Sequence, residues 1–153
     1  MKIAAIITGQ LRDYKVNALN HIKHIIEPNQ ADVFVYACNK NTMHTVGDNI
    51  TQEYNATTSI PPEILRSEVK EVYGKHLKQV VIEENENLTS DDFGTLGYFK
   101  RKMNNQMGNI RKGFLMAEKY SKDNGFEYDL IVRLRPDNSH FPLPVDLTSF
   151  PSE

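Results

Sequence analysis

Two arginines near the end of the chain are spaced as phosphate ligands would be. Arg133 and Arg135 lie two residues apart in an apolar strand, so both side chains point to one face. Their like charges repel unless an anion lies nearby, and the guanidinium fork suits phosphate oxygens, which favours a cradle for a diphosphate. Alternatively, each arginine pairs with a structural carboxylate such as Asp32, Asp129 or Asp137.

Asp137 follows a proline at the tip of the same strand. A carboxylate in this place suits a divalent cation, Mg²⁺ or Mn²⁺, that also bridges substrate phosphates. In the alternative interpretation, Asp137 only initiates a turn, helped by Asn138 and Ser139.

A second candidate segment follows the apolar run 3–7. Gly9 allows the backbone to come close to a ligand, and Arg12, with Gln10, would hold a nucleotide. Tyr14 could stack on a base. The segment is neither a Gly-x-Gly-x-x-Gly fingerprint nor a Walker loop, and many Thr-Gly turns of this kind bind nothing.

A long helix precedes the arginine strand and carries two further candidate ligands. Asn109 and Lys112 lie three residues apart, on one side of the helix, toward its middle. We interpret most of the other polar residues of this helix as a solvated face. Its apolar stripe is expected at Phe99, Met103, Met107, Ile110, Phe114 and Ala117.

Strands and helices alternate along the chain. Apolar runs predict buried strands at 3–7 and 33–37, and two further strands are expected at 77–82 and 128–134. The expected helices are a first one with apolar positions Val16, Leu19, Ile22, Ile25 and Ile26, a second from Pro61 to Gly74, and the long helix that ends at Asn124-Gly125. Residues 39–60 are polar and are expected to form a loop.

This order predicts an α/β fold that is Rossmann-like, with a mostly parallel sheet and helices on both faces. Ligands of such sheets bind beyond the carboxyl ends of the strands. We therefore expect Gln10, Arg133, Arg135 and Asp137 to lie at one end of the sheet. The 153-residue chain has the length of a single domain, 1–153.

Composition excludes some classes of protein. The formal net charge of −2 gives no basic surplus, so no nucleic-acid partner is expected. No apolar run reaches the length of a transmembrane segment. Cys38, the single cysteine, cannot form an internal disulfide, and we interpret it as a buried apolar residue of a cytoplasmic protein.

Three segments resemble one family. Residues 8–12, Thr-Gly-Gln-Leu-Arg, resemble the SGQLR start of bacterial and viral polysaccharide-synthesis proteins. Residues 31–35, Ala-Asp-Val-Phe-Val, are similar to their ADVFI strand, and residues 128–137 to their YDxIIRLRPD motif. These proteins are similar to glycosyltransferases of the GT-A fold, which use nucleotide-diphosphate sugars.

The resemblance implies a donor half of a glycosyltransferase, with a nucleotide-diphosphate sugar and a glycan acceptor as partners. In that fold an Arg-Asn pair often lies on the helix before the fourth strand, and the segment beginning at Asn109 has a similar look. The metal motif Asp-x-Asp reads Arg135-Pro136-Asp137 here, so Asp137 matches its second Asp and Arg135 replaces the first. This departure leaves metal dependence open, because a fixed arginine supplies part of the charge that a metal would provide.

We therefore expect glycosyl transfer in glycan synthesis, with Arg135 and Asp137 at the reacting centre. Few residues follow Asp137, so we also expect this chain alone to transfer sugar poorly. A non-catalytic nucleotide- or sugar-binding module is the alternative, and a structural α/β domain without a ligand is a third interpretation.

Overall fold

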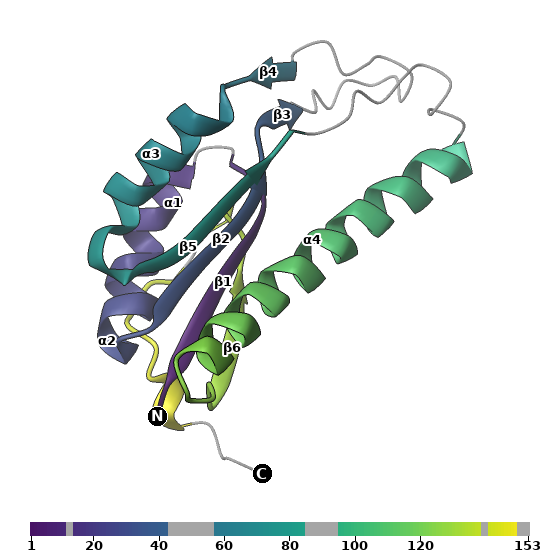
Figure 1. Cartoon of the computed structure of the whole chain (residues 1–153). Coiled ribbons are helices and arrows are strands. Elements are labelled where there is room, and N and C mark those ends of the chain that lie inside the picture. The colour runs from purple at the N-terminus through teal and green to yellow at the C-terminus, as the bar shows by residue number, and fades with distance from the viewer. Residues whose placement is uncertain (12–13, 43–56, 85–94, 139–140, 150–153) are drawn as a thin grey trace.

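The computed structural model describes residues 1–11, 14–42, 57–84, 95–138 and 141–149. Four strands, β1 (Ile3–Gln10), β2 (Asp32–Cys38), β5 (Leu77–Glu83) and β6 (Leu130–Leu134), form one sheet in the order β5-β2-β1-β6 (Figure 1). All three pairings are parallel. The predicted α/β fold with a parallel, Rossmann-like sheet is confirmed. Its central strands β1 and β2 are buried on both faces, as their apolar runs predict.

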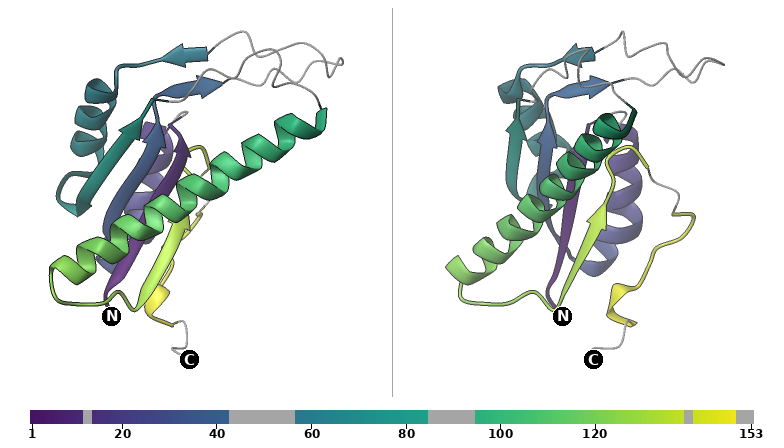
Figure 2. Two further views of the ribbon diagram at one scale, coloured as in Figure 1. Left: turned by 45° about the vertical axis from the view of Figure 1, so that its right-hand side comes forward. Right: turned by 90° about the vertical axis from the view of Figure 1, so that its right-hand side faces the viewer.

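Helices cover both faces of the sheet, as expected (Figure 2). One face carries α1 (Tyr14–His21), a π-helical turn at Ile22–Ile26, α2 (Glu27–Asn29) and α3 (Pro62–Tyr73). The other face carries α4 (Thr95–Asp123). The core is correspondingly split: Ala5, Ile7 and Val35 lie with the first group, and Ala4, Ile6 and Phe34 with α4.

The apolar stripe expected on the first helix is partly wrong. Val16 is 74% exposed and Leu19 is 67% exposed, whereas Tyr14, Ala18 and His21 are buried. Hydrogen bonds offset part of the cost of burying the two polar residues: the Tyr14 hydroxyl donates to Glu68, and His21 Nε2 donates to the carbonyl of Asn138. The apolar residue types of α1 therefore predicted the wrong face of this helix as the buried one.

The stripe expected on α4 is also partly wrong. Met107 is 61% exposed and Phe114 is 38% exposed. In the part of α4 whose side chains are described, from residue 106 on, the buried residues are small and one turn apart: Gly113, Ala117 and Ser121. A Cβ at Gly113 would lie 2.7 Å from Thr8 Cγ2, so the helix approaches β1 more closely than a large side chain would allow.

Residues 39–60 are not wholly a loop. β3 (Lys40–Thr42) pairs antiparallel with β4 (Thr57–Ser59), as a two-stranded ribbon beside the main sheet (Figure 1). The pairing is made by backbone groups, which every residue type carries, so the polar composition did not reveal it. In the described part of the chain, no helix is long and apolar enough to cross a lipid bilayer.

Candidate functional site

The order β5-β2-β1-β6 has a topological switch point between β1 and β6, because the chain leaves β1 in one direction and later returns on its other side. Crevices at such points bind ligands in open α/β sheets. The pairing of Ile7 with Leu134 brings the end of β1 beside the segment that follows β6. Gly9 lies there with φ of 134°, and a Cβ on it would be 3.7 Å from the Pro136 ring. The positive φ favours glycine at this position, whereas a Cβ would make only an ordinary contact with Pro136.

Arg133 lies at this switch point and points to the α4 face. Its Nε donates a hydrogen bond of 3.2 Å to Thr8 Oγ1. Burial lowers the pKa of Arg133, and the like charge of Arg135 lowers it further. The nearby carboxylate of Asp137 acts in the opposite direction and raises the pKa of Arg133 in part.

The three carboxylates that could have neutralised Arg133 have other partners. Asp32 pairs with Lys78 at 3.2 Å and accepts a hydrogen bond from Tyr128, while Asp129 accepts one from the backbone N–H of Lys2. Asp137 binds Arg135. Among the described residues, Arg133 thus has no carboxylate within salt-bridge distance.

Arg135 and Asp137 form a bidentate pair. Arg135 Nε donates to Asp137 Oδ1 and Nη2 to Oδ2, both at 2.9 Å. The side chain of Arg135 is 53% exposed and that of Asp137 is 26% exposed, and this carboxylate raises the pKa of Arg135. For Arg135, unlike Arg133, the structural-carboxylate interpretation therefore holds in this arrangement.

Asp137 does not present a ready set of ligands for a divalent cation. Both of its carboxylate oxygens accept hydrogen bonds from Arg135, whereas Mg²⁺ would need those oxygens itself. The described residues also include no group of three His, Cys, Asp or Glu side chains that could hold a metal ion. The expected Mg²⁺ or Mn²⁺ stays a prediction, and no chemistry below depends on it.

Helix α1 holds the segment after β6 in place. Asn17 Nδ2 donates to the Pro136 carbonyl at 3.1 Å, and His21 Nε2 donates to the Asn138 carbonyl at 3.0 Å. Burial lowers the pKa of His21, which keeps the ring neutral. These positioning residues were missed by the sequence analysis. The signal was available, since two polar residues at i and i+4 lie on a helix that packs against the sheet.

A second polar group lies on the α4 face, at the ends of β2 and β5. Lys112 Nζ donates to the two Glu83 carboxylate oxygens at 3.1 and 3.0 Å, and it lies 5.2 Å from the centre of the Tyr36 ring. A hydrogen bond from Tyr36 is the main cause of the lowered pKa of Glu83. The predicted ligand Lys112 is thus held by two residues that the sequence analysis missed.

The two groups form one row across the sheet. Thr8 pairs with Tyr36 in the β1–β2 register, and α4 spans both, with Gly113 against Thr8 and Lys112 over Tyr36. We call this set the polar row: Arg133, Thr8, Tyr36, Glu83 and Lys112. Every member lies on the α4 face, toward the carboxyl ends of the strands.

The remaining residues predicted from the sequence differ in their burial and in whether the structure describes them. Gln10 ends β1 and is half-buried, and Asn109 lies half-buried one turn before Lys112 on α4. Arg12 lies outside the described residues. The proposed stacking of Tyr14 on a base is wrong, because Tyr14 is only 5% exposed and its hydroxyl bonds Glu68.

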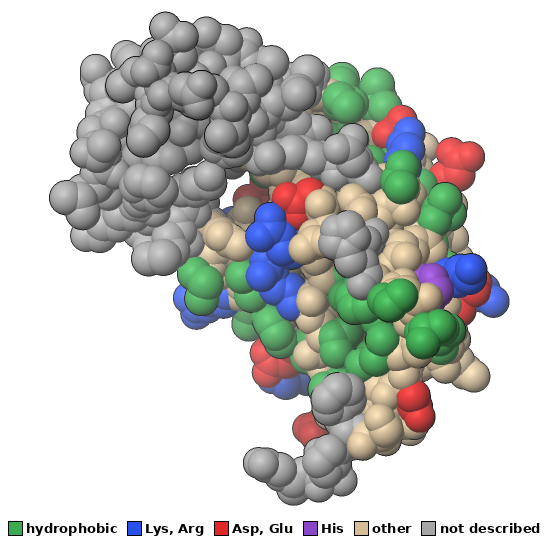
Figure 3. Space-filling model, turned by 180° about the vertical axis from the view of Figure 1, so that it is seen from behind, with side chains coloured by type: hydrophobic (Ala, Val, Ile, Leu, Met, Phe, Trp, Pro, Cys, Tyr) green, Lys and Arg blue, Asp and Glu red, His purple; other side chains and the backbone are tan. Residues whose placement is uncertain are grey.

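Fold and site together define an α/β, Rossmann-like protein with a group of cationic and polar side chains at its switch point. Seen from behind, the surface carries basic side chains next to acidic ones (Figure 3). Comparisons with protein-family models, with curated proteins and with solved structures found no match in any of the three.

Proposed function

We propose that the crevice between β1 and β6 binds the diphosphate of a nucleotide-diphosphate sugar, and that the protein is a GT-A-like glycosyltransferase or its donor-binding half. One observation carries the proposal. Arg133 is a half-buried arginine at the switch point without a carboxylate partner among the described residues. A cation in this state favours an anionic ligand, and a diphosphate matches the guanidinium fork.

The reaction would be transfer of the sugar to a hydroxyl of a glycan acceptor. A bond forms between the acceptor oxygen and the anomeric carbon, the bond from that carbon to the diphosphate breaks, and the acceptor proton passes to a base. Negative charge grows on the leaving diphosphate as this bond breaks. Arg133 would stabilise this charge, since a preorganised cation at the site of developing charge lowers the barrier.

Arg135 would supply a second guanidinium. In the free protein Asp137 holds it at 2.9 Å in a fixed position. A diphosphate would compete with Asp137 for the outer edge of Arg135, and the released carboxylate could accept hydrogen bonds from sugar hydroxyls. The nucleotide would lie along the polar row, toward Gly9 and Gln10 at the end of β1, with Arg12 as a predicted further contact.

Asn109 and Lys112 would approach this ligand from the opposite side. Both lie on α4 above the ends of β1 and β2, and Lys112 is exposed. Lys112 keeps a partner in Glu83, so its contribution to phosphate binding would be smaller than that of Arg133.

A non-catalytic nucleotide- or sugar-binding module is the second candidate, and a separate observation favours it. Among the described residues, Glu83 and Asp137 carry carboxylates at the carboxyl ends of the strands, and both are paired with cations, Lys112 and Arg135. A general base must be free to accept the acceptor proton, and a cationic partner weakens it. Binding without transfer would follow.

Two experiments in sequence test these proposals. A thermal-shift screen of nucleoside diphosphates and their sugars, with and without Mn²⁺, tests binding, because a ligand at a hundred times its Kd stabilises the protein by about 2.7 kcal/mol. Failure of every nucleotide to stabilise the chain would refute the glycosyltransferase and the nucleotide-binding module, and would leave only a module that binds sugar alone. A radiolabelled-donor assay with glycan acceptors then separates them, since only the glycosyltransferase forms labelled glycan.

A further inference from the structure

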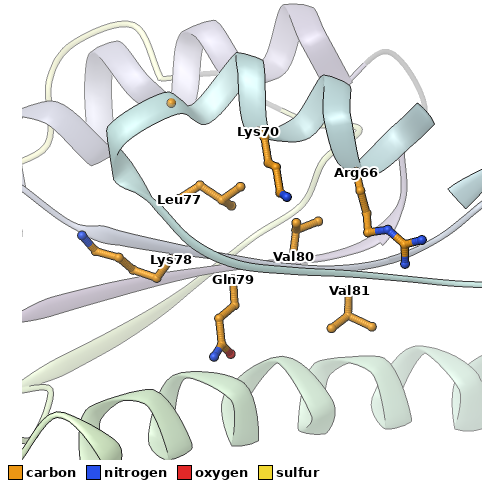
Figure 4. Close-up of a pocket in the computed structure, with 8 residues that line it drawn as sticks. Arg66, Lys70, Leu77, Lys78, Gln79, Val80 and Val81 are labelled. Atoms are coloured by element: carbon orange, nitrogen blue, oxygen red, sulfur yellow. The ribbon is translucent and has the colours of Figure 1, made fainter. Parts of the chain in front are cut away.

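A groove runs along the outer edge of β5, under α3, away from the polar row. Its volume is about 540 Å³. Arg66, Lys70 and Gly74 line it from the side of α3, and residues 77–81 line it from β5 (Figure 4). In the described part of the chain, β5 is the last strand of the sheet and pairs only with β2.

The groove follows the edge of the strand rather than one of its faces. Residues 77–81 are consecutive, yet neighbours on a strand point to opposite faces. Figure 4 shows Leu77 and Val80 directed toward α3, and Gln79 and Val81 directed toward α4. A groove lined by residues of both kinds exposes the backbone edge, whose outward N–H and C=O groups are able to pair with another strand.

The groove is also basic. Arg66 and Lys70 are one helix turn apart, and both are exposed. Neither makes an ion pair with a described residue; Glu68 of the same helix pairs instead with Lys15 on the α1 side. Lys78, at the other end of the groove, is neutralised in part by Asp32 at 3.2 Å. Unpaired positive charge therefore lies along one side of an open strand edge.

We propose that this groove binds an extended acidic peptide of a partner protein, which adds to β5 as a fifth strand. The peptide backbone would satisfy the outward groups of β5, as in other cases of strand addition. Its acidic side chains would face Arg66 and Lys70, and its apolar side chains would cover Val81, which is 36% exposed. The register irregularity opposite Leu77 and Gln79 confines regular pairing to the part of β5 beyond it.

The charge pattern argues against a second copy of this chain in the groove. Pairing of β5 with β5 of another copy would bring Arg66, Lys70 and Lys78 of both copies together, and like charges at an interface are costly. An anionic polysaccharide would meet the same cations but has no backbone that could continue the strand ladder. The exposed edge therefore favours a peptide, independently of the proposed glycosyl transfer.

Fluorescence anisotropy with the full chain tests the proposal. The probe is a labelled, capped hexapeptide that alternates Glu and Val, and a second probe carries N-methyl groups at alternate residues, which remove ladder donors but keep the charge. We expect binding of the first probe only. A double variant, Arg66→Glu with Lys70→Glu, should bind the first probe at least about tenfold more weakly, since two attractive charge pairs become repulsive.

The matched control is Lys23→Glu with Lys119→Glu, two exposed sites outside the groove that give the same change in net charge. This control should bind as the wild type does, and circular dichroism should show all variants folded. Equal weakening by both double variants, equal binding of the N-methylated probe, or tighter binding of an anionic oligosaccharide of equal charge would each overturn the proposal.

Discussion

Arg133 offers the sharpest test, because a ligand-binding arginine and a structural arginine respond differently to removal. Arg133→Met keeps most of the aliphatic volume of the side chain and removes its charge. If Arg133 binds an anionic ligand, the substitution should leave the stability of the free protein nearly unchanged and should weaken diphosphate binding. If Arg133 holds the fold together, stability should fall.

The expected change in stability follows from the contacts of Arg133. The hydrogen bond from Nε to Thr8 Oγ1 is long, at 3.2 Å, and its loss should cost at most about 1 kcal/mol. Relief of the repulsion from Arg135 and of the burial of the guanidinium should return about the same amount. We therefore expect the free energy of unfolding to change by less than about 1 kcal/mol, whereas loss of one partner of a buried ion pair costs about 3–5 kcal/mol.

The expected change in binding is larger. Hydrogen bonds to charged groups contribute about 1.5–3 kcal/mol, so the Kd of a nucleoside diphosphate should rise roughly ten- to a hundred-fold. Urea unfolding measures the first quantity and titration calorimetry the second. A loss of about 3 kcal/mol or more in stability would make Arg133 a structural residue, and an unchanged Kd would place the diphosphate elsewhere.

Three further outcomes are expected. Gly113→Ala should destabilise the protein by about 1–3 kcal/mol in urea unfolding, because the new Cβ meets Thr8 Cγ2 at 2.7 Å. Gly108→Ala on the same helix should instead stabilise the protein by up to about 1 kcal/mol, because a Cβ there meets no atom within 4 Å. Equal effects of the two substitutions would show that α4 does not pack closely against β1. His21 has a lowered pKa in the fold, so the unfolded chain binds more protons in mild acid, and unfolding free energy should fall as the pH drops below about 6.5. An NMR titration in which His21 protonates at its ordinary pKa would contradict this. Arg135→Ala should weaken diphosphate binding roughly tenfold or more in calorimetry, and equal affinity would remove Arg135 from the site.

The strands and the place of the crevice were predictable from local sequence. Apolar runs marked four parallel strands, and the rule for parallel sheets then placed Gly9, Gln10, Arg133 and Arg135 toward the same end. The signal is clearest for β1 and β2, because burial on both faces requires consecutive apolar residues. The helix faces were harder, since Tyr14 and His21 are buried through single hydrogen bonds that residue type does not reveal.

The sequence by itself determined which residue types reach the carboxyl ends of the strands, and only the tertiary structure decided their partners. Asp32 and Asp129 were both candidates for Arg133, yet Asp32 lies with Lys78 and Tyr128. The group of Tyr36, Glu83 and Lys112 likewise assembles from three separate elements. Such pairings depend on strand order, register and the close approach of α4, which are set by packing between segments far apart in the chain. Local periodicity does not encode these pairings, so only the fold showed that Arg133 has no salt-bridge partner among the described residues.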